Sequence, residues 1–414
     1  MKTLNNSKNM IFVDDENIIK TYSRDTQIRS FQYLKAKVLR KKLEDENKTK
    51  LELVDKFIKR GVKQKEVAAR LNISRYMVYS WLNRSRSPQI SNERISKQLN
   101  IPKSRLQNWF NRDNAPIPIR SVIRLKKLNF LPFIVKPTKR NLWLAGICGF
   151  VFGDGHLRKD LKSVSFGGTK QDLEAINREC EIYLNKIGTI REISTDHITK
   201  KGRICGVGYE LQISHSPFVH LLYSLGVPKG KKTIAKYEFP KWVWLNEEIL
   251  RNFCRGLLWS EISTPKLESG KNATSSTIAF HMTKHKYIIS HIKFLEEFKR
   301  GMESFGVQIS DVREMYDKNR FGFRILSNQI NVLKLHNELP ALYASNKAKA
   351  FENMMVILKR AIKIENGKVK MYDKAIDLRQ KTGWGSPRIS KELGVKQSLV
   401  DHWIYSNSKP RMYK

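Results

Sequence analysis

The sequence predicts an α+β core in which one order of elements occurs twice, with all-helical modules at both ends of the chain. Three observations lead to this expectation. Two apolar segments each end in an acid, and these acids, Asp154 and Glu261, stand 107 residues apart. Strand-like alternation and a helix-like stretch follow each acid. Outside this region a 22-residue unit occurs three times without gaps.

The composition favours nucleic acid as the partner. The 414 residues include 78 Lys and Arg against 39 Asp and Glu, which gives a net charge of +39. Such an excess repels itself unless a polyanion neutralises it. The longest apolar run, 142–152, is shorter than a bilayer span, so we expect no membrane partner. The N-terminus has no apolar signal segment, and we expect a cytoplasmic, nucleoid-associated protein.

The repeated unit predicts a helix, a tight turn and a second helix. Its copies occupy 67–88, 95–116 and 389–410, and each copy closes on a proline. Each copy has a leucine followed two residues later by Ile or Val, and then a Val or Leu three residues before a tryptophan. Helical spacing places these two pairs on successive helices. The three tryptophans are Trp81, Trp109 and Trp403.

These units resemble the helix-turn-helix units of DNA-binding proteins. In such units the second helix contacts phosphates and reads base edges in the major groove. The basic and amide side chains that we expect there are Arg75, Arg84, Lys103, Arg105 and Gln107. The alternative is a set of helical hairpins that only pack, with the tryptophans as ordinary core residues.

The two acidic segments predict a closely packed pair of helices. The first, 142–155, reads LWLAGICGFVFGDG, and the second, 253–263, reads FCRGLLWSEIS. Gly149 precedes its acid by five residues, and Gly256 precedes its acid by five. Small residues on facing helices allow the closest approach of the helix axes. We therefore expect the two glycines to pack the helices side by side, with one acid at the base of each helix.

The segments after each acid predict strands and helices in the same order. After the first acid, strands are expected within 156–167 and 189–214, with a helix over 172–187 between them. After the second acid, strands are expected within 276–282 and 309–326, with a helix over 287–305. Further helices are expected up to about residue 364.

With these residues, 141–365 resembles the LAGLIDADG homing endonucleases of the double-motif, single-chain kind. The matching motifs are ICGFVFGDG at 147–155 and CRGLLWSEI at 254–262. The resemblance implies two pseudo-symmetric αββαββα halves that form a DNA-binding saddle, and a monomer. The second motif departs from the family pattern, because Ser260, Glu261 and Ile262 replace a small residue, aspartate and glycine.

The expected domain boundaries follow from the repeats and the resemblance. The N-terminal segment 1–50 is partly helical and uncertain, and 119–140 is a linker. The remaining parts are two helix-turn-helix units at 51–118, the two LAGLIDADG halves at 141–252 and 253–365, and a C-terminal helix-turn-helix at 372–414.

The resemblance also implies a chemistry and a set of contacts. Asp154 and Glu261 would hold Mg²⁺ or Mn²⁺ between the two scissile phosphates of double-stranded DNA, with one cut per strand. Lys232 would position solvent or stabilise charge near these acids; the alternative is a solvated phosphate contact. The saddle residues expected to contact DNA are Arg158, Lys159, Lys162, Lys170, Arg191 and Lys201.

Two other functions stay open on the same scaffold. One is a DNA-binding regulator that does not cleave, which the altered second motif favours. The other is a maturase that binds intron RNA. The chain begins Met1-Lys2 and ends Tyr413-Lys414, with no nucleophile first and no asparagine last. We therefore expect a free-standing or intron-encoded protein rather than an intein.

Overall fold

The protein is an α+β chain that divides into two units. The structure, a computed structural model, describes residues 11–83, 92–193, 208–264, 266–267, 276–283, 289–314 and 320–410. One unit comprises Met1–Ile134 and Ser216–Ser224, and the other comprises Val135–His215 and Leu225–Lys414. Each unit is described by itself. Two of the expected DNA contacts, Arg84 and Lys201, lie outside the described residues.

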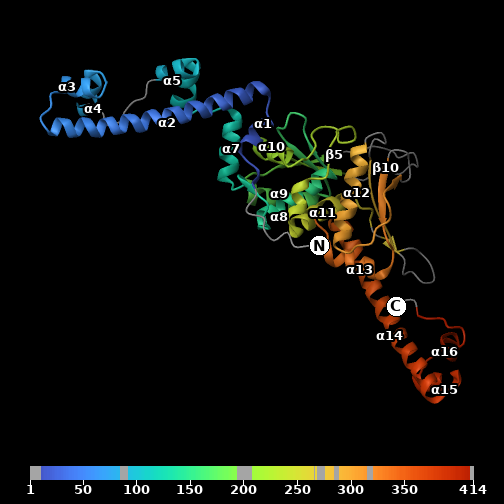
Figure 1. The fold of residues 1–414 in the computed structure, drawn as a ribbon. Coiled ribbons are helices and arrows are strands. Elements are labelled where there is room, and N and C mark those ends of the chain that lie inside the picture. Colours follow the sequence, from blue (N-terminus) through green and yellow to red (C-terminus); the bar gives the residue numbers. More distant parts are fainter. Residues whose placement is uncertain are drawn as a thin grey trace. The chain divides into compact units, whose positions relative to one another are not determined.

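The first unit is built on one long helix. Helix α2 (Arg24–Lys59) has no glycine or proline within it, and the first glycine after it, Gly61, has a φ of 79°. The other elements of this unit are β1 (Ile11–Val13), α1 (Asp15–Lys20), α3 (Gln64–Arg70), α4 (Arg75–Asn83), α5 (Asn92–Leu99), α6 (Lys103–Leu106), the π-helix η1 (Gln107–Asn111), α7 (Ile117–Lys127), β2 (Phe133–Ile134) and α10 (Ser216–Ser224). Figure 1 shows α3 and α4 at one end of α2 and α5 further along it.

Short helices pack against α2 in two places. We call α3 with α4 the first helical pair, and α5 with α6 and η1 the second helical pair. In the first pair, Val67, Val78 and Trp81 form a buried core with Val54 of α2. In the second pair, Trp109 meets Tyr33 of α2 edge to face, with ring centroids 5.6 Å apart. The tryptophans therefore fix each pair to the same long helix.

The second unit contains two antiparallel sheets of four strands. Its element order is α8 (Lys139–Phe152), β3 (Gly155–Leu157), β4 (Val164–Gly168), α9 (Lys170–Leu184), β5 (Thr189–Ile193), β6 (Gly208–Ile213), η2 (Lys241–Leu245), α11 (Glu247–Glu261), β7 (Lys266–Leu267), β8 (Ser276–Thr283), α12 (Ile289–Ser304), β9 (Arg313–Glu314), β10 (Arg320–Ile325), α13 (Gln329–Glu338), α14 (Ser345–Thr382), α15 (Ser386–Leu393) and α16 (Gln397–Ile404). The sheets have the orders β3-β4-β6-β5 and β7-β8-β10-β9. The same strand order therefore occurs in both sheets. The described parts of the expected strands and helices lie within or next to the ranges that the sequence predicted, and residues 194–207, 287–288 and 315–319 of those ranges lie outside the described residues.

Capping residues fix where the two motif helices begin. Thr138 accepts a hydrogen bond from the backbone N of Asn141 at the start of α8. Asn246 accepts one from the backbone N of Ile249 at the start of α11. These side chains satisfy backbone donors that a helix start leaves free. Both helices end at residues that the motifs identified.

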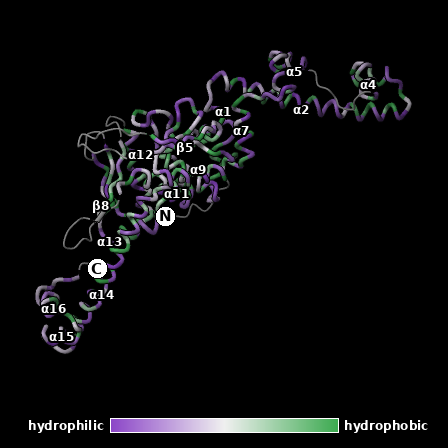
Figure 2. Tube along the Cα trace, turned by 180° about the vertical axis from the view of Figure 1, so that it is seen from behind, coloured by the Kyte–Doolittle hydropathy of each residue, from purple (hydrophilic) through white to green (hydrophobic). Residues whose placement is uncertain are grey.

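A second long helix, α14, carries the C-terminal helices. Near its start Phe351 and Met355 are buried, and near its end Tyr372 packs on Trp403 of α16. We call α15 with α16 the third helical pair. Figure 2 shows hydrophilic and hydrophobic residues mixed along both α2 and α14. The middle of α14, from Lys359 to Lys370, has no buried residue.

The elements cross some of the expected boundaries. Helix α2 runs through the boundary placed at 50–51, and α14 runs through the one placed at 365. The expected linker 119–140 contains most of α7 and all of β2. Helix α7 forms there because Ile119, Val122 and Leu125 recur at helical spacing and are buried. The sequence suggested a linker there only from the Pro and Lys residues that follow α7.

The described helices include none with the length and apolar content to cross a bilayer.

Candidate functional site: two acids at the ends of paired helices

Helices α8 and α11 lie in backbone contact through the two motif glycines. A Cβ on Gly149 would lie 2.1 Å from the carbonyl O of Phe253. A Cβ on Gly256 would lie 2.0 Å from the carbonyl O of Gly146. Because side chains larger than hydrogen do not fit at such distances, glycine is what permits this approach. The structure thus places Gly149 and Gly256 where the sequence predicted the helix pair to touch.

The positions of the two acids follow from this packing, because each acid stands at the end of one of the two packed helices. Helix α8 ends at Phe152, Gly153 caps it, and Asp154 comes next. Glu261 is the last residue of α11. A Cβ on Gly153 would lie 3.0 Å from Cγ of Glu261, so the side chain of Glu261 lies beside the backbone just before Asp154, and the charge of Asp154 acts on Glu261. The structure therefore brings the two predicted acids to one place.

Lys232 reaches the end of α8. Its Nζ donates to the carbonyl oxygens of Val151 and Phe152, both at 3.1 Å, and also to that of Gly153. The segment before it is held by the backbone N of Gly230, which donates to the carbonyl O of Leu157 at 2.8 Å. The sequence named Lys232 as a residue near the acids, and the structure places it there.

Lys347 occupies the matching position at the end of α11, and sequence reasoning did not identify it. Its Nζ donates to the carbonyl oxygens of Trp259 at 3.0 Å and Ser260 at 2.8 Å. One signal was available. Lys232 stands 78 residues after Asp154, and Lys347 stands 86 residues after Glu261. A search for a lysine at similar spacing after the second motif would have pointed to this part of the chain.

The four charged groups shift one another's pKa values. The pKa of Glu261 is raised to about 7, first by burial and then by the negative charge of Asp154, while Lys232 and Lys347 oppose the shift. Asp154 as a whole residue is exposed, but its carboxyl group lies near the helix ends and has lost part of its contact with water. This desolvation raises the pKa of Asp154, and the positive charges of Lys347 and Lys232 oppose the shift. Burial lowers the pKa of Lys232 to about 8 and also lowers that of Lys347, while the negative charges of Asp154 and Glu261 oppose both shifts. The shared cause is a partly enclosed cluster of opposite charges.

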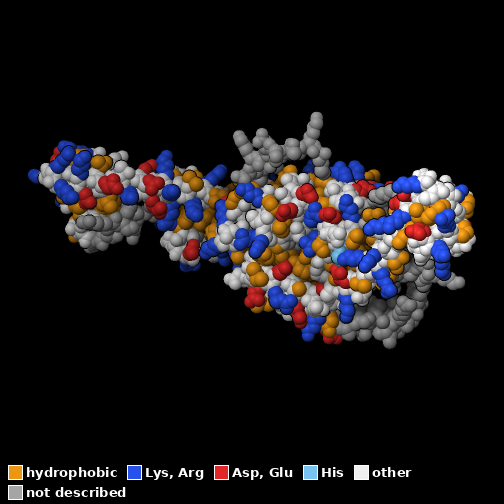
Figure 3. All heavy atoms as spheres, turned by 90° about the horizontal axis from the view of Figure 1, so that it is seen from below, with side chains coloured by type: hydrophobic (Ala, Val, Ile, Leu, Met, Phe, Trp, Pro, Cys, Tyr) orange, Lys and Arg blue, Asp and Glu red, His pale blue; other side chains and the backbone are white. Residues whose placement is uncertain are grey.

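The expected DNA contacts on the core are exposed. Arg158 forms an exposed ion pair with Asp160 at 3.2 Å. Exposed positions are occupied by Arg158, Lys159, Lys162, Lys170 and Arg191. Figure 3 shows Lys and Arg side chains spread over the face in view. These side chains are therefore accessible to a polyanion.

The helical pairs expose most of their expected contacts. Arg75, Lys103 and Gln107 are exposed on α4, α6 and the start of η1. Arg105 differs, because it is half-buried and donates to the side-chain oxygen of Gln32 on α2 at 3.0 Å. In the structure Arg105 holds its helix against α2.

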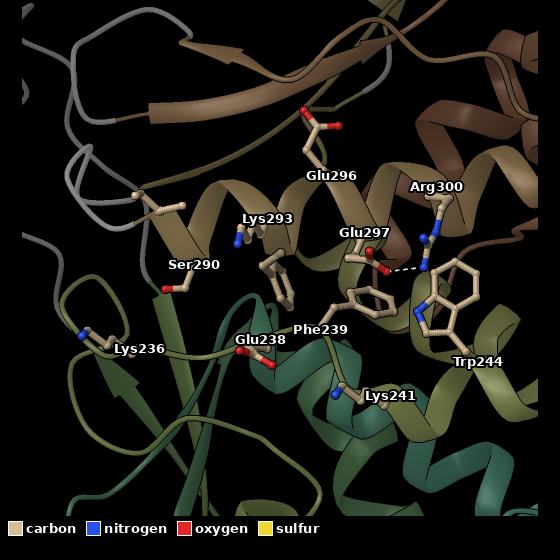
Figure 4. A pocket seen from close by; sticks show the side chains of 12 residues that line it. Lys236, Glu238, Phe239, Lys241, Trp244, Ser290, Lys293, Glu296, Glu297 and Arg300 are labelled. Atoms are coloured by element: carbon tan, nitrogen blue, oxygen red, sulfur yellow. Dashed lines mark hydrogen bonds and ion pairs between the residues drawn. The ribbon is translucent and has the colours of Figure 1, made fainter.

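A cavity of about 790 Å³ lies between the start of α12 and the segment that leads into α11 (Figure 4). Trp244 and Arg300 stack on its wall with the guanidinium carbon 4.5 Å from the ring centroid, and Arg300 pairs with Glu297 at 2.5 Å. Neither the two acids nor the two lysines line this cavity. It is a separate feature from the carboxylate cluster.

Comparison with known proteins gives partial matches, and no protein-family model matches the chain. The replication factor C small subunit of Methanocaldococcus jannaschii is 27% identical over 59% of this chain and 13% of that protein. The RNA polymerase subunit Rpo1N of the same organism is 28% identical over 51% and 16%. The tRNA-splicing ligase RtcB of Pyrococcus furiosus is 31% identical over 44% and 19%. This chain spans less than a fifth of the length of each of these relatives.

Solved structures give a weak likeness. The N-terminal LAGLIDADG domain of WhiA has a TM-score of 0.33 and 12% identity, over 53% of this chain and 90% of that one. I-DmoI in complex with DNA and Mn has a TM-score of 0.32 and 15% identity, over 49% and 97%. These scores are too low to assign a function.

Proposed function

We propose that the chain is a metal-dependent endonuclease of the LAGLIDADG homing type that cuts double-stranded DNA at a specific site. One observation carries the proposal: Asp154 and Glu261, which are distant in sequence, meet at the ends of two helices packed through Gly149 and Gly256. Enclosing two carboxylates together is unfavourable unless a cation joins them. Phosphodiester hydrolysis by metal ions uses such a carboxylate pair.

The carboxylate pair suits a hard divalent cation such as Mg²⁺ or Mn²⁺. Among the described residues, no group of three or more His, Cys, Asp or Glu side chains gathers as a metal site. Magnesium is commonly held by one or two carboxylates, with phosphate oxygens and water as its other ligands. When bound, the ion would activate water and stabilise the charge on the leaving oxygen. Asp154 and Glu261 would each supply carboxylate oxygens to it.

The two lysines have a defined place in this proposal. Lys232 and Lys347 each neutralise the carbonyl end of one motif helix, next to one acid. Their positive charges lie beside the two acids, where they would offset the negative charge of a bound DNA phosphate. We assign both lysines to positioning and charge stabilisation around the phosphate.

DNA would lie along the strands of the two sheets, which form the saddle of two pseudo-symmetric halves. The exposed cations of the first half would neutralise phosphates there, with Lys201 as a further candidate. The helix-turn-helix pairs would lengthen the contacted sequence through Arg75, Arg84, Lys103 and Gln107. The net charge of +39 supports a polyanion as the partner.

The relatives support a transferable unit rather than their own named activities. A replication factor C subunit, an RNA polymerase subunit and a tRNA-splicing ligase have unlike names, yet each matches this chain over a small part of its own length. A segment shared by such proteins is separable from the activity that names each of them. We therefore infer no ligase or polymerase activity for this chain.

The test uses the full-length protein and DNA that it selects itself. A plasmid library with random inserts is incubated with the protein and Mg²⁺, and cut molecules are recovered and sequenced. We expect linear product at one recurrent site, and at least a hundredfold less product from Asp154→Asn and from Glu261→Gln. Glu248→Gln is the matched control, since Glu248 is exposed on the first turn of the same helix α11.

The outcomes separate the candidate functions. Equal cutting by Asp154→Asn and the wild type would reject the assignment of the site. Binding to selected DNA without any cutting would favour a regulator, a candidate supported by Glu261 and the buried Ile262 in place of the usual acid and glycine. Preference for a structured intron RNA over duplex DNA at the same salt concentration would favour a maturase.

A further inference from the structure

Helix α2 carries two sets of contact residues that repeat every 18 positions. In the second helical pair, Phe110 stacks on Tyr33 at 5.5 Å and lies under the guanidinium of Arg40 at 4.9 Å. In the first helical pair, residues of α2 join the core around Trp81. The corresponding positions are Tyr33 and Leu51, Ala36 and Val54, and Arg40 and Ile58.

This repeat has a geometric meaning. Eighteen residues make five full turns of an α-helix, so both sets face the same side of α2. At 1.5 Å per residue, the sets are about 27 Å apart along the helix axis. The distance is set by α2 itself, because both pairs pack directly on it. The two pairs are thus held on the same side of one helix at a fixed spacing.

Both pairs expose side chains suited to DNA. The second helix of the first pair presents Arg75 together with Tyr76 and Tyr79, which are 66% and 44% exposed. The corresponding helix of the second pair presents Lys103 and Gln107. Tyrosine hydroxyls and a basic side chain on one helix can together bind phosphates and base edges of a nucleic acid. The segment 24–127 contains 27 Lys and Arg against 9 Asp and Glu, which complements a polyanion.

We propose that α2 is a ruler that sets both helical pairs on one face of a single DNA duplex and bends the duplex toward the protein. This rests on the proposed function only in taking duplex DNA as the partner. With α2 along the duplex, successive major-groove segments on one face of straight B-DNA recur about every 34 Å. A spacing of about 27 Å is shorter. A bend of roughly 40° per turn shortens the inner face of the duplex from about 34 Å to about 27 Å per turn. A bend of this size is within the range that proteins impose on DNA.

The test changes the length and the phase of α2 separately. Insertions are made in the full-length protein between Lys48 and Thr49, which are exposed between the two contact sets. Seven helix-forming residues add about 10 Å and rotate the first pair by only about 20°. Five residues add about 7 Å but rotate it by about 140°. The DNA is a duplex selected from a random library by the wild-type protein.

Two measurements are made on each protein. Hydroxyl-radical footprinting shows which nucleotides are covered, and the part due to the first pair is the part lost in Arg75→Ala/Tyr79→Ala. Energy transfer between dyes on the duplex ends measures the bend. Circular dichroism and the melting temperature must match the wild type, which shows that the added turns have not disrupted either pair.

We expect the wild type to bring the duplex ends closer together. The seven-residue insertion raises the spacing to about 37 Å, close to the groove repeat of roughly 34 Å in straight B-DNA. It should therefore keep both footprints, move that of the first pair by about one base pair at most, and straighten the duplex. The five-residue insertion should lose the footprint of the first pair. Equal footprints from both insertions, or a straight duplex with the wild type, would refute the proposal that α2 sets the spacing of the two pairs on bent DNA. Either result would leave DNA binding itself intact. Failure of the library to yield any bound duplex would instead reject DNA as the partner.

Discussion

Replacing Gly256 by alanine tests how closely α8 and α11 approach. The added Cβ would lie 2.0 Å from the carbonyl O of Gly146 and 2.9 Å from the backbone N of Phe150. Non-bonded carbon and oxygen atoms stay roughly 3 Å or more apart, so the helices must separate by about 1 Å. The change therefore strains the interface that brings the two acids together.

The size of the effect follows from the cost of overpacking. Extra atoms in a well-packed core cost about 1–3 kcal/mol, and the contact here is with backbone rather than a movable side chain. For a folded unit of this size, each kcal/mol lowers the melting temperature by about 2–4 °C. Alanine also favours the helix by about 1 kcal/mol, which offsets part of the loss. Because the backbone contact places the cost at the upper end of this range, the net loss is about 2 kcal/mol, and we expect Gly256→Ala to melt roughly 4–8 °C below the wild type.

The assay is differential scanning calorimetry of the full chain, with a matched glycine as control. Gly367 lies within α14, and a Cβ there would meet no atom within 4 Å. Gly367→Ala should therefore be neutral or stabilising by up to about 1 kcal/mol. If Gly256→Ala melts at or above the wild type, as the control does, the close packing of α8 and α11 is wrong.

Three further predictions concern residues near the site. Lys347→Met leaves two carbonyls at the end of α11 without a donor, so the free energy of unfolding in urea should fall by about 1–3 kcal/mol, and an unchanged value would contradict the cap. Tyr343→Phe removes the hydroxyl that donates to partly buried Glu179, and a similar loss is expected, whereas Tyr405→Phe at an exposed position should unfold like the wild type. Because the pKa of Glu261 is raised from 4.5 to about 7, the folded chain holds a proton there that the unfolded chain releases. The free energy of unfolding of the wild type, measured in EDTA, should thus fall as the pH rises from about 4.5 to about 7. Glu261→Gln should lack this contribution to the pH dependence, and an identical pH dependence in both proteins would refute the raised pKa of Glu261.

The helix pair could be predicted because its determinants are local. A glycine five residues before an acid identifies both helix faces, and Gly149 and Gly256 are the residues whose backbones touch. The strands and helices after each acid were readable from alternation and helical spacing in the same way. That Asp154 lies near Glu261 could be predicted only by matching the two motif segments, 142–155 and 253–263, to each other.

The second lysine could not be predicted in this way. Lys347 reaches the site because α14 begins at Ser345, whose backbone N donates to Asp172 at 2.8 Å. That contact joins positions 173 residues apart, and no window of sequence contains both. The length of α2 was missed for a related reason. The repeat that revealed the helical pairs contains none of α2, although the pairs depend on it for their spacing.

The electrostatics of the site give a physical reason to connect it with cations. The carbonyl end of a helix carries partial negative charge, which disfavours an acid there. Here two such ends lie together, and Asp154 and Glu261 add their own charges to them. Lys232 and Lys347 compensate at the carbonyls, yet the pKa values of both acids stay raised, so the compensation is incomplete. An arrangement that costs stability in this way is typical of functional sites, and a divalent cation between the acids is the species that would remove the remaining repulsion.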